Sequence, residues 1–307
     1  MEIRYRAENA MDITHEKVWP KELLYWRRMS SKDISDYVKK TPKNKRLVLL
    51  VWGVLEAHGP YMPVANDSHL ASLAADKVAI TLMKKHGVQP IIFNSWMDLG
   101  SRSATWEFPG AIGVHSSTVP VIRTMFEQTI ERMVQEGFTK FFVVNGDGGN
   151  WMNHWFGIQW DSKVIRDLRT SHGIVLRGSN WDQEGGAPYL HAGVYDHALI
   201  TWACKYAPEF ERLSAIRHGL RAPNDKDLKS IENDQAFLED DPYRETDWSQ
   251  YPGQDKLRSV TKFVFKEYMD ALYNKDGSPR TEGGAKADFE AKIENLMKKA
   301  LAVVKAK

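Results

Sequence analysis

An α/β fold with a mostly parallel sheet is the architecture that this sequence predicts. Short apolar runs typical of buried strands alternate with longer segments of helical periodicity, and this alternation occurs four times between Leu47 and Arg177. Such alternation favours right-handed βαβ crossovers, which place the strands parallel to one another. Polar residues also gather where strands end, and ligands of open α/β sheets bind at that edge.

Four strands and six helices account for the periodic segments. The predicted strands are Leu47–Trp52, Gln89–Trp96, Thr139–Val144 and Ile174–Arg177. The predicted helices are Ser31–Lys40, a helix with apolar spacing from Leu70 to Leu82, Val119–Glu136, Trp151–Leu168, Val260–Tyr273 and Phe289–Ala302. Asp67 or Ser68 is expected to be the N-cap of the second helix, and Gly87 and Gly137 are expected to end the second and third.

Composition divides the chain into three parts of one domain. Residues 1–45 are polar and mixed, and we expect them to form an N-terminal extension packed on the core. Residues 46–215 contain the alternating strands and helices and form the expected core. Residues 216–307 read as an irregular excursion followed by the C-terminal helices, within the same domain.

Charge and cysteine content exclude several classes of function. The chain has 307 residues, 42 of them basic and 40 acidic, and no basic block that would favour nucleic acid. A single cysteine, Cys204, rules out an intrachain disulfide and a cysteine-rich zinc site. No apolar stretch approaches the length of a membrane helix, and the charged N-terminal segment has no export signal. We therefore expect a soluble, cytoplasmic protein without nucleic-acid or membrane partners.

The first polar cluster follows the strand Leu47–Trp52. Glu56, His58, Asp67 and His69 lie within fourteen residues, interleaved with glycine and proline that indicate a loop. Carboxylates and imidazoles are ligands for zinc, manganese or iron. The alternative is a solvated loop, in which such residues are common, but the position after a buried strand favours a metal site.

A second and a third cluster follow later strands. The third strand ends in the segment Asn145-Gly146-Asp147-Gly148-Gly149-Asn150. Within it, Asp147 is either a further metal ligand or part of an Asx turn or helix cap. Its glycine spacing does not match a nucleotide-binding loop. The third cluster, which follows the fourth strand, contains His191 and Asp196. The alternatives to a functional role are a buried histidine hydrogen-bonded to the backbone for His191 and a helix cap for Asp196.

Four short motifs together resemble those of the creatininase family of metal-dependent amidohydrolases. They are Glu56-Ala57-His58-Gly59-Pro60, Phe108-Pro109-Gly110, the segment 145–150, and His191-Ala192-Gly193 with Asp196, in family order. The resemblance implies a three-layer α/β/α domain, often assembled as a hexamer, with two divalent metals bridged by an aspartate and a hydroxide.

The resemblance also implies roles for individual residues. Glu56 would ligate the first metal and His58 the second, with Asp67 bridging them. Asp147 stands where the family has a histidine ligand, which favours harder metals such as manganese, iron or magnesium over zinc alone. His191 would transfer protons.

The second metal's ligand set departs from the family pattern. Gly149 stands where creatininase has a glutamate ligand. Asp196 or His69 would have to replace that glutamate, so one or two ions of zinc, manganese or iron are expected.

The expected activity is that of a metal-dependent hydrolase, in which metal-bound hydroxide attacks a carbonyl of a small cyclic amide or cyclic ketone. One branch similar to this chain opens the ring of 3-dehydro-scyllo-inosose in inositol catabolism, by cleaving a C–C bond. A non-catalytic ligand-binding homologue is the alternative from another class, favoured by Asp147 and Gly149. Trp151, Trp155, Trp160 and Trp181 either line the pocket or belong to the core.

Overall fold

A parallel sheet forms the centre of the molecule. The computed structural model describes residues 22–55, 65–96, 119–147, 162–181, 184 and 285–306. Within these ranges a five-stranded sheet has the order β1-β3-β2-β4-β5, and every adjacent pair is parallel. Its strands are β1 (Leu24–Tyr25), β2 (Val48–Trp52), β3 (Ile91–Trp96), β4 (Lys140–Asn145) and β5 (Val175–Asn180). The four predicted strands are confirmed.

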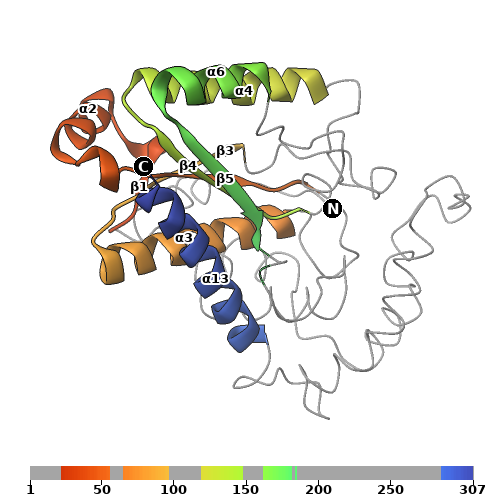
Figure 1. The fold of residues 1–307 in the computed structure, drawn as a ribbon. Coiled ribbons are helices and arrows are strands. Elements are labelled where there is room, and N and C mark those ends of the chain that lie inside the picture. The colour runs from red at the N-terminus through yellow and green to blue at the C-terminus, as the bar shows by residue number, and fades with distance from the viewer. Residues whose placement is uncertain are drawn as a thin grey trace, which may run out of the picture.

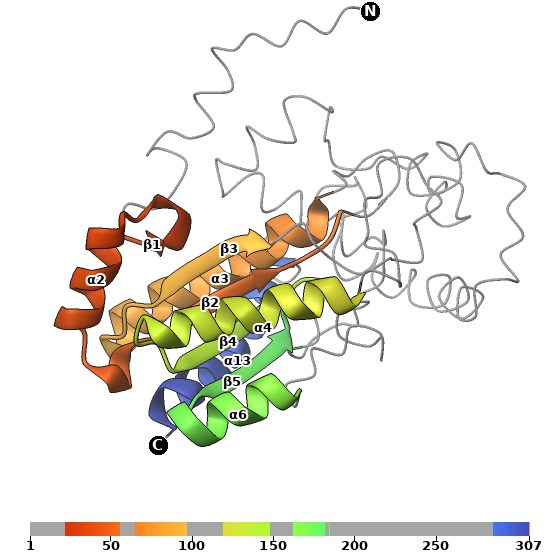
Figure 2. The same ribbon diagram turned by 90° about the horizontal axis from the view of Figure 1, so that it is seen from above.

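The helices complete a three-layer α/β/α arrangement (Figure 1). They are α2 (Ser31–Lys40), α3 (Asn66–His86), α4 (Val119–Gln135), α6 (Lys163–His172) and α13 (Ala285–Lys305), with the 3-10 turns η1 (Trp26–Arg28) and η2 (Lys43–Lys45). Helices α3 and α13 cover one face of the sheet, and α4 and α6 cover the other (Figures 1 and 2). None of the helices in the described ranges has the length and hydropathy needed to cross a membrane.

Strand alternation distributes the apolar side chains between two cores. On β2, Leu49 and Val51 face α3 and α13, whereas Val48 and Leu50 face α4 and α6, and all four are at most 1% exposed. A strand buried on both faces is apolar at nearly every position, which explains the uninterrupted apolar run of β2 in the sequence.

Two helix ends form as the sequence predicts, and one helix start has a cap that was not predicted. Ser30 and Asp33 form this capping box at the start of α2. Gly87 at the end of α3 and Gly137 after α4 have positive φ values of 60° and 97°, which glycine adopts at little cost.

Other boundaries differ from the prediction. Helix α6 continues to His172, because the residue that terminates it is Gly173 in the left-handed conformation. Strand β5 extends to Asn180, since its pairing with β4 continues as far as Asn145. Strand β1 was not predicted; it has only two residues and lies in a polar segment. The predicted helix Val260–Tyr273 and residues 151–161 lie outside the described residues.

The topology places a switch point at the centre of the sheet. The chain leaves β2 for β3 on one side and then returns past β2 to β4 on the other. The connection through α3 covers one face, and the connection through α4 covers the opposite face (Figure 2). Such a reversal opens a crevice at the carboxyl ends of the two central strands, which here are β2 and β4.

Candidate metal centre

The first turn of α3 lies directly against the carboxyl ends of β2 and β4. Gly53 follows β2, and a Cβ atom added to it would lie 2.6 Å from the Cα atom of Ser68. Gly146 follows β4, and a Cβ atom there would lie 2.9 Å from the Cβ atom of Ala71 and still closer to the carbonyl oxygen of Asp67. Two glycines therefore allow this close approach of helix and strand ends.

Hydrogen bonds join these strand ends to one another and to the helix. The backbone N–H of Gly146 donates to the carbonyl of Trp52 at 2.7 Å, which continues the ladder between β4 and β2 by one residue. The hydroxyl of Ser68 donates to the carbonyl of Val54 at 3.3 Å. The start of α3 is thus held to the segment that leaves β2.

Asp67 is the second residue of α3, and its side chain is buried, with 2% of the residue exposed. The prediction that Asp67 or Ser68 is the N-cap is wrong. The N-cap is Ala65, whose carbonyl accepts from the N–H of His69 at 2.9 Å. The helix begins earlier because packing of its first turn against the two glycines fixes it there, without a side-chain cap. In this position the Asp67 carboxylate lies at the positive end of the helix dipole.

Asp147 lies two residues beyond β4 and is 5% exposed. It follows Gly146, whose backbone lies against the backbone of Asp67. Two buried aspartates that are 80 residues apart in the sequence therefore lie at the same edge of the sheet.

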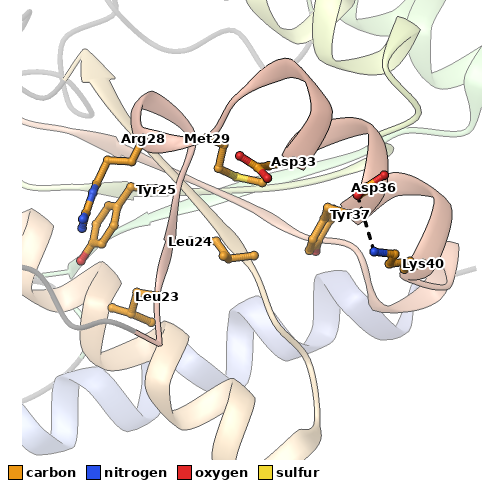
Figure 3. A pocket seen from close by; sticks show the side chains of 9 residues that line it. All are labelled: Leu23, Leu24, Tyr25, Arg28, Met29, Asp33, Asp36, Tyr37 and Lys40. Atoms are coloured by element: carbon orange, nitrogen blue, oxygen red, sulfur yellow. Dashed lines mark ion pairs between the residues drawn. The ribbon is translucent and has the colours of Figure 1, made fainter. Parts of the chain in front are cut away.

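A groove elsewhere on the surface is a poor candidate for the active site. It has a volume of about 590 Å³ and lies between β1, η1 and α2 (Figure 3). Its lining residues are Leu23, Leu24, Tyr25, Arg28, Met29, Asp33, Asp36, Tyr37 and Lys40. Strand β1 and α2 lie at the end of the molecule away from the first turn of α3 (Figures 1 and 2).

Both acidic residues of this groove have partners on α2 or at its N-cap. Asp36 pairs with Lys32 at 2.6 Å and with Lys40 at 3.5 Å. The hydrogen bond from Lys32 is the main cause that lowers the pKa of Asp36. Asp33 is engaged in the cap of α2.

Comparison with known proteins identifies the family. The model of the family described as Creatininase, creatinine amidohydrolase, matches residues 27–241, which is more than half of the chain. The chain belongs to the creatininase family.

Solved structures agree with this family at the level of the fold. A putative creatinine amidohydrolase from Bacteroides fragilis NCTC 9343 is 16% identical with a TM-score of 0.55, covering 94% of this chain and 99% of its own. A second solved creatinine amidohydrolase, or creatininase, is 15% identical with a TM-score of 0.56, and the coverage is 93% and 99%. A comparison with curated proteins finds no match.

For this creatininase-family chain, the structure reports on only part of the predicted ligand set. Asp67 and Asp147 are both buried at the carboxyl edge of the sheet, and their role as ligands stays a prediction. Glu56, His58, His191 and Asp196 lie outside the described residues and also stay predictions. Within the described ranges, no three acidic, histidine or cysteine residues form a group that could hold a metal.

His69 is half-buried on α3, two residues after Asp67. Helical residues with that spacing do not face each other. The position of His69 therefore disfavours it as a ligand shared with Asp67.

Two buried amides near this edge were missed by sequence reasoning. Asn94 in β3 is 2% exposed, and among the described residues neither of its amide atoms has a hydrogen-bond partner. Asn180 at the end of β5 is 1% exposed and pairs with Asn145. An asparagine inside an apolar strand is the signal that could have identified Asn94.

Trp181, by contrast, is a core residue. It is fully buried and packs edge-on against Phe289 of α13, with ring centroids 5.6 Å apart. Of the two predicted roles for this tryptophan, its position supports the core.

Proposed function

We propose that this protein is a metal-dependent hydrolase that acts on a carbonyl group of a small cyclic substrate. The observation that carries the proposal is the close packing of the Asp67 backbone against Gly146, the residue before Asp147, at the carboxyl ends of β2 and β4. Asp67 and Asp147 are both buried, they come from separate connections of the sheet, and they lie at its topological switch point. Membership of the creatininase family supports hydrolysis as the reaction class.

The residues fit a divalent metal by their chemistry. Asp67 and Asp147 supply oxygen donors, and the motif containing Glu56 and His58 would add another carboxylate and an imidazole. Oxygen-rich sites suit manganese, iron or magnesium, and an imidazole ligand also admits zinc. A divalent metal bound there would lower the pKa of water and polarise a carbonyl group of the substrate.

The remaining roles belong to the chain itself. Asp67 lies in the first turn of α3, whose packing against Gly146 holds the backbone that carries this carboxylate. We assign proton transfer to the leaving group to His191, with Asp196 as a further metal ligand. The bond cleaved is the C–N bond of a cyclic amide or the C–C bond of a cyclic ketone such as an inositol-derived ketone.

The experiment compares Asp67→Asn with Asp76→Asn. Both are buried aspartates of α3, and Asp76 accepts a hydrogen bond from the hydroxyl of Tyr25 at 2.8 Å, which asparagine can also accept. Bound metal is measured by elemental analysis, and turnover is screened against cyclic amides and inositol-derived ketones. We expect Asp67→Asn to lose metal and activity and Asp76→Asn to keep both.

A second arm tests His191. His191→Ala should lower turnover by roughly 10²–10⁴-fold, the usual contribution of general acid–base catalysis, while metal content stays unchanged.

Metal retained in Asp67→Asn would contradict the metal site. A metal-loaded protein that hydrolyses none of the screened compounds would favour the non-catalytic alternative.

A further inference from the structure

A buried pair of amides connects β5 to the backbone of Asp147. Asn145 ends β4 and Asn180 ends β5, and the two residues are register partners in the sheet. They are 0% and 1% exposed. The Nδ2 atom of Asn145 donates to the carbonyl of Asp147 at 2.6 Å and also to Oδ1 of Asn180.

The direction of these hydrogen bonds follows from chemistry. A backbone carbonyl can only accept, so the atom of Asn145 that faces Asp147 has to be the amide nitrogen. That NH2 group has two hydrogens, and the second one requires an acceptor on Asn180. The oxygen of Asn180 therefore faces Asn145, and its own NH2 group is turned away.

This orientation leaves the second amide incompletely bonded. Nδ2 of Asn180 is buried and has no hydrogen-bond partner within the part of the chain that the structure describes. A buried donor without an acceptor is unfavourable. The hydrogen bond to Asn145 therefore sets the orientation of Asn180, and among the described residues this orientation gives its Nδ2 atom no acceptor.

The backbone at Asp147 depends on such support. Asp147 lies beyond the last residue of β4, and Gly148 and Gly149 follow it in the sequence. Glycines restrict the preceding residue little, because their own backbone is the least constrained. The hydrogen bond from Asn145 thus fixes the Asp147 carbonyl from the strand side, and Asn180 fixes Asn145.

We propose that Asn180 is a positioning residue for the metal centre, acting on Asp147 through the side chain of Asn145. The inference rests on the proposed function, because it requires Asp147 to be a metal ligand. Residues that orient metal ligands typically contribute 10–100-fold to metal affinity. Asn180 would supply such a contribution from the neighbouring strand without touching the metal.

The test measures Mn²⁺ affinity by competition with a chelating dye, using the parent protein and four variants, one of which is Asp67→Asn. Asn180→Leu removes the acceptor, and we expect a 10–100-fold loss of affinity. Asn180→Asp keeps an oxygen facing Asn145, so we expect no loss. Ser179→Ala is the matched control, because Ser179 is the adjacent residue in β5 and bonds instead to Glu184.

The outcomes separate this inference from the proposed function. Unchanged affinity in Asn180→Leu, or an equal loss in Asn180→Asp or Ser179→Ala, would overturn the positioning role. If Asn180→Leu does not fold, Asn180→Ala replaces it with the same expectation. If Asp67→Asn binds Mn²⁺ with the affinity of the parent protein, the metal centre itself is refuted. If Asp67→Asn loses Mn²⁺ but Asn180→Leu does not, the metal centre stands and only the inference about Asn180 fails.

Discussion

At the scale of single residues, Gly146 is the position on which the candidate metal centre depends most directly. The absence of a side chain there lets α3 approach β4, and this approach places Asp67 beside the segment that carries Asp147. The atoms that an added Cβ would meet belong to the backbone of Asp67 and to Ala71, neither of which can rotate away. Gly146 therefore determines both the packing of α3 and the position of Asp67, the proposed metal ligand.

Gly146→Ala should destabilise the protein and weaken metal binding together. Overpacking of this kind costs about 1–3 kcal/mol, and relieving it would displace the first turn of α3. Gly173→Ala is the control. It should lower the free energy of unfolding by a similar amount, about 1–2 kcal/mol, because Gly173 has a φ of 61°. An added Cβ there would meet no atom within 4 Å, so this variant displaces no neighbouring element. Urea denaturation and Mn²⁺ titration of both variants check this. Equal Mn²⁺ affinity in the two variants would contradict the account.

At the scale of elements, α13 is joined to the end of β5 by a polar cluster. The Nζ atom of Lys299 lies 2.5 Å from Oε1 of Glu184 and 3.1 Å from the hydroxyl oxygen of Ser179. The side-chain amide of Asn295 donates to the carbonyl of Glu184 at 2.6 Å. The carboxylate of Glu184 is nearly inaccessible to water, with 4% of its side chain exposed, so it depends on these donors.

Lys299→Met should lower the free energy of unfolding by about 1–3 kcal/mol, because it leaves a buried carboxylate without its cationic partner. Lys298→Met is the matched control on the same helix. Lys298 pairs with Glu294 at 2.9 Å, and both side chains are at least 60% exposed, so its loss should cost less than about 0.5 kcal/mol. The urea denaturation midpoints of the two variants measure this difference in stability. Similar midpoints would contradict a stabilising role for the cluster of Lys299, Glu184 and Ser179.

Helix α2 is joined to the sheet by Tyr37. Its hydroxyl donates to the carbonyl of Gln89 at 2.6 Å, and burial raises its pKa to about 12. A raised pKa in the folded state means that the native protein holds this proton more tightly. The resulting stability is complete below pH 10 and is lost as the pH rises through 12.

Tyr37→Phe should therefore change how stability depends on pH. Between pH 8 and pH 11 the parent protein should lose about 1.4 kcal/mol through Tyr37, and the variant should lack this contribution. Lys140, whose pKa is lowered by burial, is present in both proteins, so it does not affect the difference. Urea denaturation at the two pH values measures it. Parallel losses in the two proteins would refute the assignment to Tyr37.

At the scale of the whole molecule, the sequence predicts more of the sheet than of the site. Strands such as β2 and β4 are predictable because burial on both faces makes them continuously apolar. Their carboxyl ends also predict that Asp67 and Asp147 lie at one edge of the sheet, where the structure places both residues. The start of α3 was misplaced because tertiary contact with Gly53 and Gly146 fixes it, and local capping patterns carry no information about that contact.

Asn180 was missed for a related reason. Its role arises from register pairing with Asn145 across two strands, and a single sequence does not contain that pairing. Long-range partners of this kind, including Glu184 with Lys299, appear only once the sheet and α13 are assembled.

The measurement that tests the central claim most directly is an anomalous difference map from crystals grown with Mn²⁺. The account predicts a peak whose distance to carboxylate oxygens of both Asp67 and Asp147 is about 2.0–2.2 Å, the usual metal–oxygen bond length. The same crystals of Asp67→Asn should lack this peak. A manganese peak that contacts neither aspartate, or an Asp67→Asn crystal with the peak unchanged, would contradict the metal centre proposed at the ends of β2 and β4.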